Sequence, residues 1–245
     1  MVIKFILLII GAYLLGSVPA AYLVAKWRRG IDIRQYGSGN VGAANVLAVV
    51  SKRWSIVVTI FDVGKGALTV LVAQQLLGLG VAQQVAVGIA TIIGHNWPVF
   101  LRFQGGRGIF TSLGVITMFS PKLGLIVLVM SYLLAPFRQV SLGVSLSLVS
   151  LPILSWFLSQ PLGIGIEERL PVTLGFVVLV LIALSRRLTV PRTPLSESVS
   201  PLQLFINRLL FDRDIRDRKA WISQTRSEIG LMEQSLGQEE EQGKA

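Results

Sequence analysis

The first long apolar run of the chain, residues 2–25, reads VIKFILLIIGAYLLGSVPAAYLVA and contains a single charged side chain, Lys4. About 20 apolar residues are enough to cross the hydrocarbon layer of a membrane as a helix. The next charges, Lys26, Arg28 and Arg29, follow the run, whereas a signal peptide carries its positive charge before the apolar core. The run therefore predicts a permanent membrane-spanning helix.

Further apolar runs predict further spans, at residues 55–79, 81–100, 109–120, 123–136, 140–159 and 171–185. The fold class expected is an all-α polytopic integral membrane protein with about seven transmembrane helices. The fourth and fifth spans of this set are short and meet at Ser120-Pro121-Lys122. An alternative joins them into one long tilted helix, which leaves about six spans.

Composition supports a membrane protein. The 245 residues are 52% hydrophobic and 15% charged, with a mean hydropathy of +0.67, and a soluble domain of this size cannot bury so much apolar surface. Cysteine is absent and His95 is the single histidine, which excludes disulfides, thiolate chemistry and multi-histidine metal sites. The net charge of +10 suits anionic headgroups, anionic substrates or nucleic acid. The apolar spans favour membrane lipids and anionic substrates, and no nucleic-acid partner is expected.

Basic residues fall in alternate loops. If the N-terminus lies outside, the loops beyond the membrane carry little charge except Lys122 and the sequence Glu167-Glu168-Arg169. This asymmetry follows the positive-inside rule, so we expect a cytoplasmic C-terminus and cytoplasmic glycine-rich loops. The residues on the cytoplasmic side are then Lys26, Arg28, Arg29, Arg34, Lys52, Arg53, Arg102, Arg107, Arg138, Arg186, Arg187 and Arg192.

The composition changes near residue 190, which divides the chain into a membrane-embedded domain (1–190) and a polar C-terminal extension (191–245). Pro191, Pro194 and Pro201 predict an extended linker. After it, apolar residues recur at helical spacing: Leu202, Phe205, Leu209, Ile215, Ile222, Ile229, Met232 and Leu236. The extension is therefore expected to be partly helical, amphipathic and basic, and to contact anionic lipid or a partner. The candidate partners are a second copy of the chain, giving a homo-oligomer, or another protein.

Two glycine-rich segments carry the candidate chemistry. The first, at residues 37–45, reads GSGNVGAAN, and the second runs from Gly94 to Gly108 and ends in GGRG. Backbone N–H groups at glycines form nests that bind phosphate, and an arginine beside them adds a fork of donors. An ordinary Gly/Asn/Ser turn between helices explains the first segment equally well. His95 fits either acid–base chemistry or a structural hydrogen bond.

Asp62 and Lys65 lie inside the span predicted at residues 55–79. Charged groups inside a membrane are costly and face a polar cavity or each other. Their separation of three positions places them on one helical face, so a mutual structural pair and a role in the site are both open.

These segments together resemble the acyl-phosphate-dependent glycerol-3-phosphate acyltransferase family (PlsY-type), bacterial inner-membrane enzymes that make lysophosphatidate. The resemblance covers residues 1–190 and rests on the segments 15–19, 30–34, 37–45, 62–66, 94–98, 103–108 and 138–142. It implies a seven-helix bundle in the inner membrane whose motif loops converge at the cytoplasmic face.

The resemblance implies transfer of a fatty acyl group from acyl phosphate to the 1-hydroxyl of glycerol 3-phosphate. Acyl phosphate is a mixed anhydride and already activated, so the enzyme acts by positioning and charge stabilisation, and the donor's own phosphate takes the proton. No metal or cofactor is implied. Ser38 and glycine amides hold the acyl phosphate, Arg107, Lys65 and Ser141 neutralise phosphate charge, and apolar helix faces take the acyl chain.

The site residues carried over from the family fall into two groups. The catalytic residues are Ser38, His95, Asn96 and Arg107. The substrate-binding residues are Gly37, Gly39, Asn40, Gly42, Asn45, Lys65, Gly105, Gly106, Arg138 and Ser141.

Several positions depart from the family pattern. Ala44 stands in place of a threonine, Ala48 in place of an arginine for the acceptor phosphate, and Arg107 in place of a lysine. Arg186 and Thr189 stand where the family's closing His-Arg-x-Asn motif has histidine and asparagine. Because these changes cluster on the acceptor side, a divergent paralogue with another acceptor is an alternative.

Three further alternatives remain open. Lys52 and Arg53, one helical turn after Ala48, are candidate replacements for the missing arginine. A catalytically inactive relative that acts as a scaffold for lipid enzymes through its basic tail is a second possibility. A transporter with Asp62 and Lys65 along its pathway is the third, and it is disfavoured because transporters place such groups at the midplane between repeats.

Overall fold

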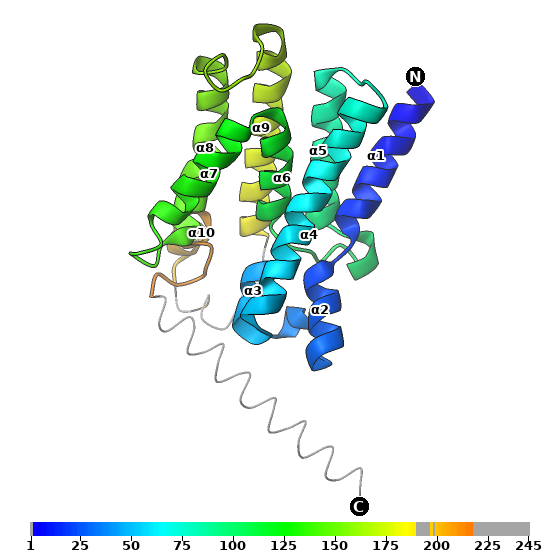
Figure 1. Ribbon diagram of the computed structural model, residues 1–245. Coiled ribbons are helices and arrows are strands. Elements are labelled where there is room, and N and C mark those ends of the chain that lie inside the picture. Colours follow the sequence, from blue (N-terminus) through cyan, green and yellow to red (C-terminus); the bar gives the residue numbers. More distant parts are fainter. Residues whose placement is uncertain (1, 190–196, 198, 218–245) are drawn as a thin grey trace, which may run out of the picture.

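The computed structural model describes residues 2–189, 197 and 199–217, and in these ranges the chain is all helical, with no strand. The helices lie side by side as one bundle, with α2 and α3 at the end opposite the N-terminus (Figure 1). Their bounds are α1 Val2–Ser17, α2 Ala20–Arg29, α3 Ala43–Val49, α4 Lys52–Leu71, α5 Val81–Asn96, α6 Ile109–Phe119, α7 Pro121–Leu133, α8 Val140–Phe157, α9 Ile166–Leu188 and α10 Pro201–Phe211. Short turns of other helix types are Ile33–Gln35, Val72–Leu76 and Val99–Leu101.

The predicted spans are confirmed as helices. Five stretches within the described residues are long and apolar enough to cross a membrane: Val2–Arg29, Lys52–Leu76, Val81–Leu101, Val140–Phe157 and Ile166–Leu188. The other two runs form α6 and α7, which are apolar but shorter. An all-α membrane fold is therefore confirmed, whereas the number of complete crossings stays a prediction.

The first span is broken, which the apolar run did not reveal. α1 ends at Ser17 and α2 begins at Ala20 because Pro19 has no N–H to donate and its ring clashes with the carbonyl four residues earlier. A helix end leaves carbonyl oxygens without partners inside the helix. The carbonyls of Gly16 and Val18 accept hydrogen bonds from Lys65 Nζ instead, at 3.0 and 3.3 Å. The break therefore directs backbone oxygens into the bundle.

The short helices α6 and α7 are separate, so joining them into one tilted helix is wrong. Ser120 lies between them in an extended conformation (φ −155°, ψ 105°), and its hydroxyl accepts from the Leu123 amide at 3.1 Å. Pro121 occupies the first turn of α7, the position that a helix tolerates for proline. The same hydroxyl donates to the Leu162 carbonyl at 2.5 Å, which joins this turn to the α8–α9 connection.

α4 and α6 cross with their backbones nearly in contact. A Cβ atom at Gly66 would collide with the Thr111 carbonyl, and one at Gly114 would collide with the Val63 carbonyl. Each helix therefore presents a glycine to the other's backbone, as in close helix crossings of membrane proteins. This crossing fixes α4, which carries Asp62 and Lys65, against α6, which begins directly after Arg107.

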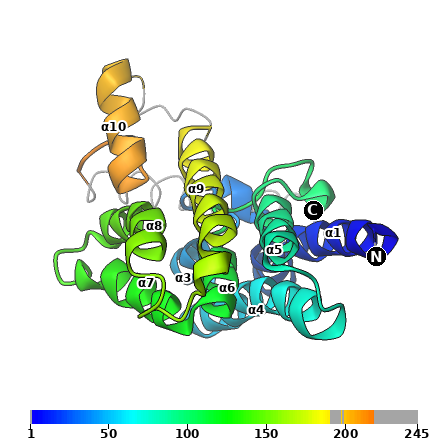
Figure 2. The same ribbon diagram turned by 90° about the horizontal axis from the view of Figure 1, so that it is seen from above.

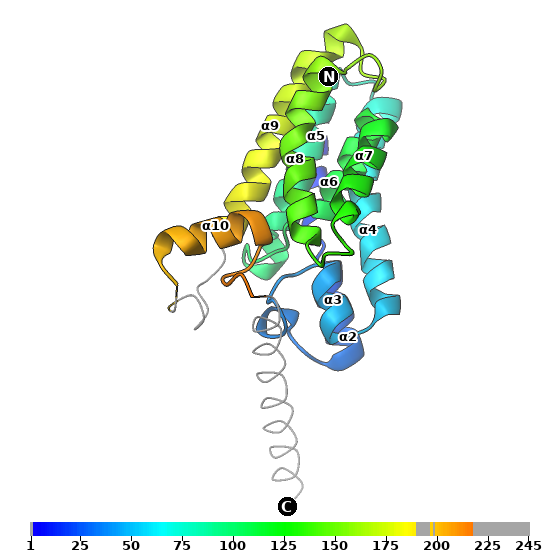
Figure 3. The same ribbon diagram turned by 90° about the vertical axis from the view of Figure 1, so that its left-hand side faces the viewer.

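The C-terminal extension folds back on the bundle as α10. Seen from the side, α10 lies crosswise to α8 and α9 at the end where the loops gather (Figure 3), and from above it lies at the edge of the bundle beside them (Figure 2). The helix ends at Phe211, so Ile215 is not part of a continuous amphipathic helix, contrary to the predicted pattern. Pro191, Pro194, Ile222, Ile229, Met232 and Leu236 lie outside the described residues.

Candidate active site

A cavity of about 200 Å³ lies among the helices and reaches the end of the bundle where the loops gather. One part of its wall is polar and charged, with Asn40, Asp62, His95, Arg107, Ser141, Arg187 and Asp212. The other part is apolar, with Leu113, Ile116, Val127, Leu128, Val144 and Leu148 from α6, α7 and α8. The cavity thus joins a site suited to an anion with a site suited to a hydrocarbon chain.

Asp62, Lys65 and His95 form a buried cluster at the inner side of the cavity. Lys65 Nζ lies 2.9 Å from Asp62 Oδ1 and 2.9 Å from His95 Nδ1, and His95 Nδ1 lies 3.5 Å from the same carboxylate oxygen. The lysine and the aspartate are each only 3% exposed. Because an ammonium group can only donate, His95 Nδ1 accepts and the neutral ring carries its proton on Nε2.

His95 also fixes the second glycine-rich loop. The Gly106 amide donates to the His95 carbonyl at 3.1 Å, and a Cβ atom at Gly106 would collide with His95 Nε2. The glycine therefore permits the loop to lie directly against the imidazole ring. Asn96, the next residue, is fully buried, and neither of its side-chain polar atoms has a hydrogen-bond partner among the described residues.

Arg186 braces this loop from α9. Its Nε and NH2 groups donate to the carbonyls of Gly106 and Gly105 at 3.1 and 2.9 Å, and its guanidinium lies 5.9 Å from the centre of the Trp97 ring. The arginine that replaces the family's histidine therefore has a defined structural role. It orients the residues directly before Arg107.

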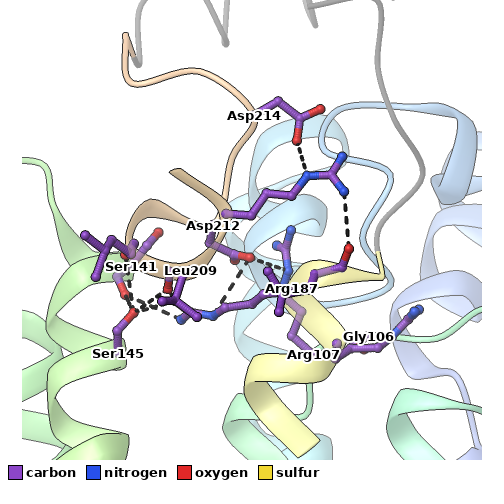
Figure 4. Close-up of polar contacts among 12 residues, drawn as sticks. Gly106, Arg107, Ser141, Ser145, Arg187, Leu209, Asp212 and Asp214 are labelled. Atoms are coloured by element: carbon purple, nitrogen blue, oxygen red, sulfur yellow. Dashed lines mark hydrogen bonds and ion pairs between the residues drawn. The ribbon is translucent and has the colours of Figure 1, made fainter. Parts of the chain in front are cut away.

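Arg107 and Arg187 converge on the carboxylate of Asp212 (Figure 4). Arg107 Nε lies 2.8 Å from Asp212 Oδ1, and Arg187 Nε lies 4.0 Å from the same atom. Burial raises the pKa of the Asp212 carboxyl, although both guanidinium groups favour its charged form. Arg187 also donates to the Ser145 hydroxyl and, at 2.8 Å, to the Leu209 carbonyl, so α8, α9 and α10 meet at this arginine.

The first glycine-rich loop is held by Asn45. Its Oδ1 accepts from the Ser38 amide at 3.1 Å, and its Nδ2 donates to the carbonyls of Ile33 and Tyr36 at 3.1 and 2.9 Å. These bonds shape the loop so that Asn40 and Gly42 line the cavity. Asn45 itself is buried beneath the loop.

The structure thus brings together part of the predicted site. Asn40, Gly42, His95, Arg107 and Ser141 line the cavity. The remaining predicted residues do not line it, and they are Gly37, Ser38, Gly39, Asn45, Lys65, Asn96, Gly105, Gly106 and Arg138. Of the two candidate replacements for the missing arginine, neither lines the cavity, and Ala48 is exposed like both of them.

Lys65 is the clearest difference from the predicted roles. Its ammonium group contacts Asp62, His95 and a backbone carbonyl of the α1–α2 break, and Lys65 does not line the cavity. Arg138 is exposed in the turn between α7 and α8, where its φ of 58° is left-handed. Neither residue is among those that line the cavity.

Sequence reasoning missed two charged residues of the cavity wall. Arg187 follows the predicted span 171–185 and stands at the arginine position of the closing His-Arg-x-Asn motif, which is the sequence signal that could have found it. Asp212 lies in the extension, twenty-five positions further along the chain, and no local pattern connects it with Arg107. The contact becomes visible only when α10 folds back.

Comparisons with known proteins agree with the helical membrane fold described above. A model of the glycerol-3-phosphate acyltransferase family matches residues 6–192, so the chain belongs to this family of integral membrane acyltransferases. Two relatives from Dehalococcoides mccartyi are glycerol-3-phosphate acyltransferase 4 of strain CBDB1 and glycerol-3-phosphate acyltransferase 5 of strain ATCC BAA-2266. The first is 48% identical over 89% of this chain and 93% of the relative, and the second is 47% identical over 91% and 94%.

Solved structures of PlsY, an integral membrane glycerol 3-phosphate acyltransferase, have the same fold. Its glycerol 3-phosphate form is 31% identical, with a TM-score of 0.70, and the match covers 89% of this chain and 97% of that one. Its lysophosphatidic acid form is 30% identical, with a TM-score of 0.68. The chain is therefore a multi-pass membrane protein of this enzyme family.

Proposed function

We propose that this chain transfers a fatty acyl group from acyl phosphate to the 1-hydroxyl of glycerol 3-phosphate, giving lysophosphatidate and phosphate. The observation that carries the proposal is that one and the same cavity has an arginine pair at one end and an apolar wall at the other. Such a cavity suits two phosphate-bearing substrates, one of which has a long hydrocarbon chain. Membership of the acyltransferase family gives the same reaction class.

The chemistry needs no nucleophile from the protein. The 1-hydroxyl oxygen forms a bond to the acyl carbon, the bond from that carbon to the phosphate oxygen breaks, and the leaving phosphate takes the hydroxyl proton. The enzyme contributes orientation and stabilisation of the negative charge. Arg107 and Arg187 neutralise phosphate oxygens, while Asn40 completes the polar wall.

Ser38 and the glycines of the two loops keep their proposed roles in holding the acyl phosphate, and Asn96 keeps its proposed role in shaping the second loop. Ser38 is exposed at the first loop, so this role requires the donor phosphate to reach the loop surface from the cavity. His95 is assigned a part in shaping the second loop, supported by its contact with Gly106. Lys65 and Asn45 act through the residues that they hold.

The test is acyl transfer by the purified full-length protein. Given acyl phosphate and glycerol 3-phosphate, it should release phosphate and form lysophosphatidate in equal amounts. Arg107→Gln should lower kcat/KM by about 100-fold or more, because one cation of a buried anion site is lost. Arg102→Gln is the matched control, since Arg102 is exposed in the same loop and should have little effect.

The outcomes separate the alternatives. Donor binding without turnover points to another acceptor, as the changes at Ala44 and Ala48 suggest. Absence of both donor binding and turnover contradicts the enzyme, and uptake of solute by vesicles would then favour a transporter. Ser38→Ala tests the first loop separately.

For the orientation, we propose an outside N-terminus and a cytoplasmic C-terminus in a bacterial inner membrane. The proposal is supported by the basic residues of the α5–α6 and α7–α8 connections and of the end of α9, because these parts lie at the bundle end away from the N-terminus (Figure 1). Because the chain has no cysteine, single cysteines at Arg138 and Glu167 can be labelled with an impermeant reagent in intact cells. Labelling at Glu167 alone is expected, and labelling at Arg138 alone contradicts the orientation.

A further inference from the structure

The C-terminal segment from α10 to Asp214 lies over the polar end of the cavity and is held there by several buried contacts. The Ser145 hydroxyl donates to the Leu210 carbonyl at 3.2 Å, and Arg187 donates to the Leu209 carbonyl at 2.8 Å. Arg208 Nε lies 2.7 Å from Asp214 Oδ1, and Arg208 NH1 donates to the Leu188 carbonyl at 3.3 Å. The position of the segment is therefore defined by contacts to α8 and α9.

Asp212 is the residue of this segment that lines the cavity. It follows the last residue of α10 in a left-handed conformation (φ 60°, ψ 39°), which aspartate tolerates better than most residues. Its side chain is only 14% exposed, and it lies between Arg107 and Arg187 in Figure 4. A carboxylate therefore already satisfies the two cations that would bind a phosphate.

This arrangement sets a condition on any ligand. The two guanidinium groups carry two positive charges, and the Asp212 carboxylate supplies one negative charge. A monoanionic ligand that replaced it would bring the same charge and the same kind of donor–acceptor contact. A phosphate dianion brings twice the charge and one further acceptor oxygen. Because Asp212 is tethered, it competes at a high effective concentration.

We infer that Asp212 is an internal competitor at the arginine pair, a tethered carboxylate that every anionic ligand has to displace and that lowers the affinity for each of them by the same factor. The identity of the displacing ligand as a substrate phosphate rests on the proposed function. The competition itself rests only on the contacts of Asp212 with Arg107 and Arg187. An opposite role, in which Asp212 orients Arg107 for binding, predicts opposite effects of substitution.

The experiment is equilibrium binding to the purified full-length protein by calorimetry. The two ligands are glycerol 3-phosphate, a dianion, and glycerate, a monoanion whose carboxylate replaces the phosphate-bearing CH2 group of the first. Asp212→Asn is compared with Asp212→Glu, which keeps the charge, and with Glu167→Gln, which removes an exposed charge at the far end of the bundle. Far-UV circular dichroism and thermal unfolding verify that each variant is folded.

Asp212→Asn is expected to bind glycerol 3-phosphate and glycerate each about tenfold more tightly, or by about 1.4 kcal/mol, because neither ligand then has a carboxylate to displace. Asp212→Glu and Glu167→Gln should keep the affinities of the parent chain. Weaker binding of glycerol 3-phosphate by Asp212→Asn would establish the orienting role and overturn the inference. Unchanged affinities would overturn it as well.

Turnover assays distinguish this inference from the proposed reaction. If no variant transfers acyl groups but Asp212→Asn tightens the binding of both ligands as expected, the proposed reaction fails and the inference stands. If the parent chain is active and Asp212→Asn binds both ligands more weakly, the reaction stands and the inference fails.

Discussion

Two carboxylates in this molecule each lie between two basic side chains. Asp62 is 2.9 Å from Lys65 and 3.5 Å from His95, and Asp212 is 2.8 Å from Arg107 and 4.0 Å from Arg187. The first cluster is assembled on α4 and α5, inside the region matched by the family. The second depends on a segment that follows residue 192, where the family match ends.

The two clusters differ in whether a ligand can take the place of the carboxylate. Lys65 is also tied to the carbonyls of Gly16 and Val18, so the first cluster joins α4 and α5 to the α1–α2 break, and its ammonium group has no donor to spare for a ligand. In the second cluster, Asp212 is carried by a segment that contacts α8 and α9 at the bundle edge (Figure 2). We therefore interpret the first as a permanent part of the scaffold and the second as a site where a ligand can replace the carboxylate.

The largest expected effect comes from breaking the first cluster. Asp62→Asn leaves the buried Lys65 ammonium without its carboxylate, so the free energy of unfolding should fall by about 3–5 kcal/mol. Thermal unfolding in detergent measures the change, with Asp212→Asn as the matched substitution in the second cluster. If Asp212→Asn destabilises the fold as much as Asp62→Asn, the distinction between a permanent and a replaceable carboxylate is wrong.

Adding Lys65→Met to Asp62→Asn sharpens the same test. The double variant removes both charges, and it should recover a large part of the stability lost in Asp62→Asn because no unpaired charge remains in the interior. No recovery would indicate that Lys65 is held mainly by the backbone carbonyls.

The next effect concerns the loop that carries Arg107. Arg186→Gln removes two hydrogen bonds to the carbonyls of Gly105 and Gly106, so the arginine after them should lose its fixed position. We expect kcat/KM to fall by about tenfold, since small misplacements of a charged group reduce catalysis strongly. Steady-state kinetics measure this, and Arg169→Gln, at the opposite end of α9, serves as the control. Equal activity of both variants would contradict the bracing role.

A smaller effect should come from the contact that docks α10. Ser145→Ala removes a hydroxyl that interacts with Arg187 and with the Leu210 carbonyl, and each such hydrogen bond stabilises by about 1 kcal/mol. Hydrogen exchange at residues 201–211 should become faster, while exchange in α4 stays the same. Equal acceleration in both helices would show that α10 does not open independently of the bundle.

The smallest effect is expected for a half-buried ion pair, that of Asp32 and Arg34. Arg34 lowers the pKa of the Asp32 carboxyl below its ordinary value of 3.8, since its guanidinium donates to both carboxylate oxygens. A lowered pKa in the folded state contributes stability above pH 3.8, and this contribution is lost as the pH falls through the lowered pKa. Comparing thermal unfolding of the parent chain and Asp32→Asn between pH 6 and pH 3 measures it. The gap between them should narrow at the acid end, and a gap that widens contradicts the sign of the shift.

The sequence predicted the helices well because apolar runs of this length have few other solutions. It also placed Asp62 and Lys65 on one face, since a spacing of three residues determines that geometry. The break at Pro19 was missed because hydropathy does not register a missing N–H group. Its consequence, the capture of Lys65 by freed carbonyls, therefore could not be predicted either.

The site was predicted only in part. His95, Arg107 and Ser141 lie on motifs whose chemistry is local, and the structure places them at the cavity. The roles assigned to Lys65 and Arg138 depended on where the side chains point, which a motif does not contain. Asp212 could not be found, because its contact with Arg107 joins residues that are adjacent only after α10 folds back.

The close crossing of α4 and α6 has a consequence for the size of the cavity. With Gly66 and Gly114 against the opposing backbones, these two helices cannot separate or slide without losing that fit. The cavity therefore has one stiff wall, and room for a longer or bulkier hydrocarbon can come only from the opposite side, where Val127 and Leu128 of α7 face Val144 and Leu148 of α8. Evolution or engineering of a new acyl-chain range should accordingly change residues of α7 and α8 and leave the glycine crossing untouched.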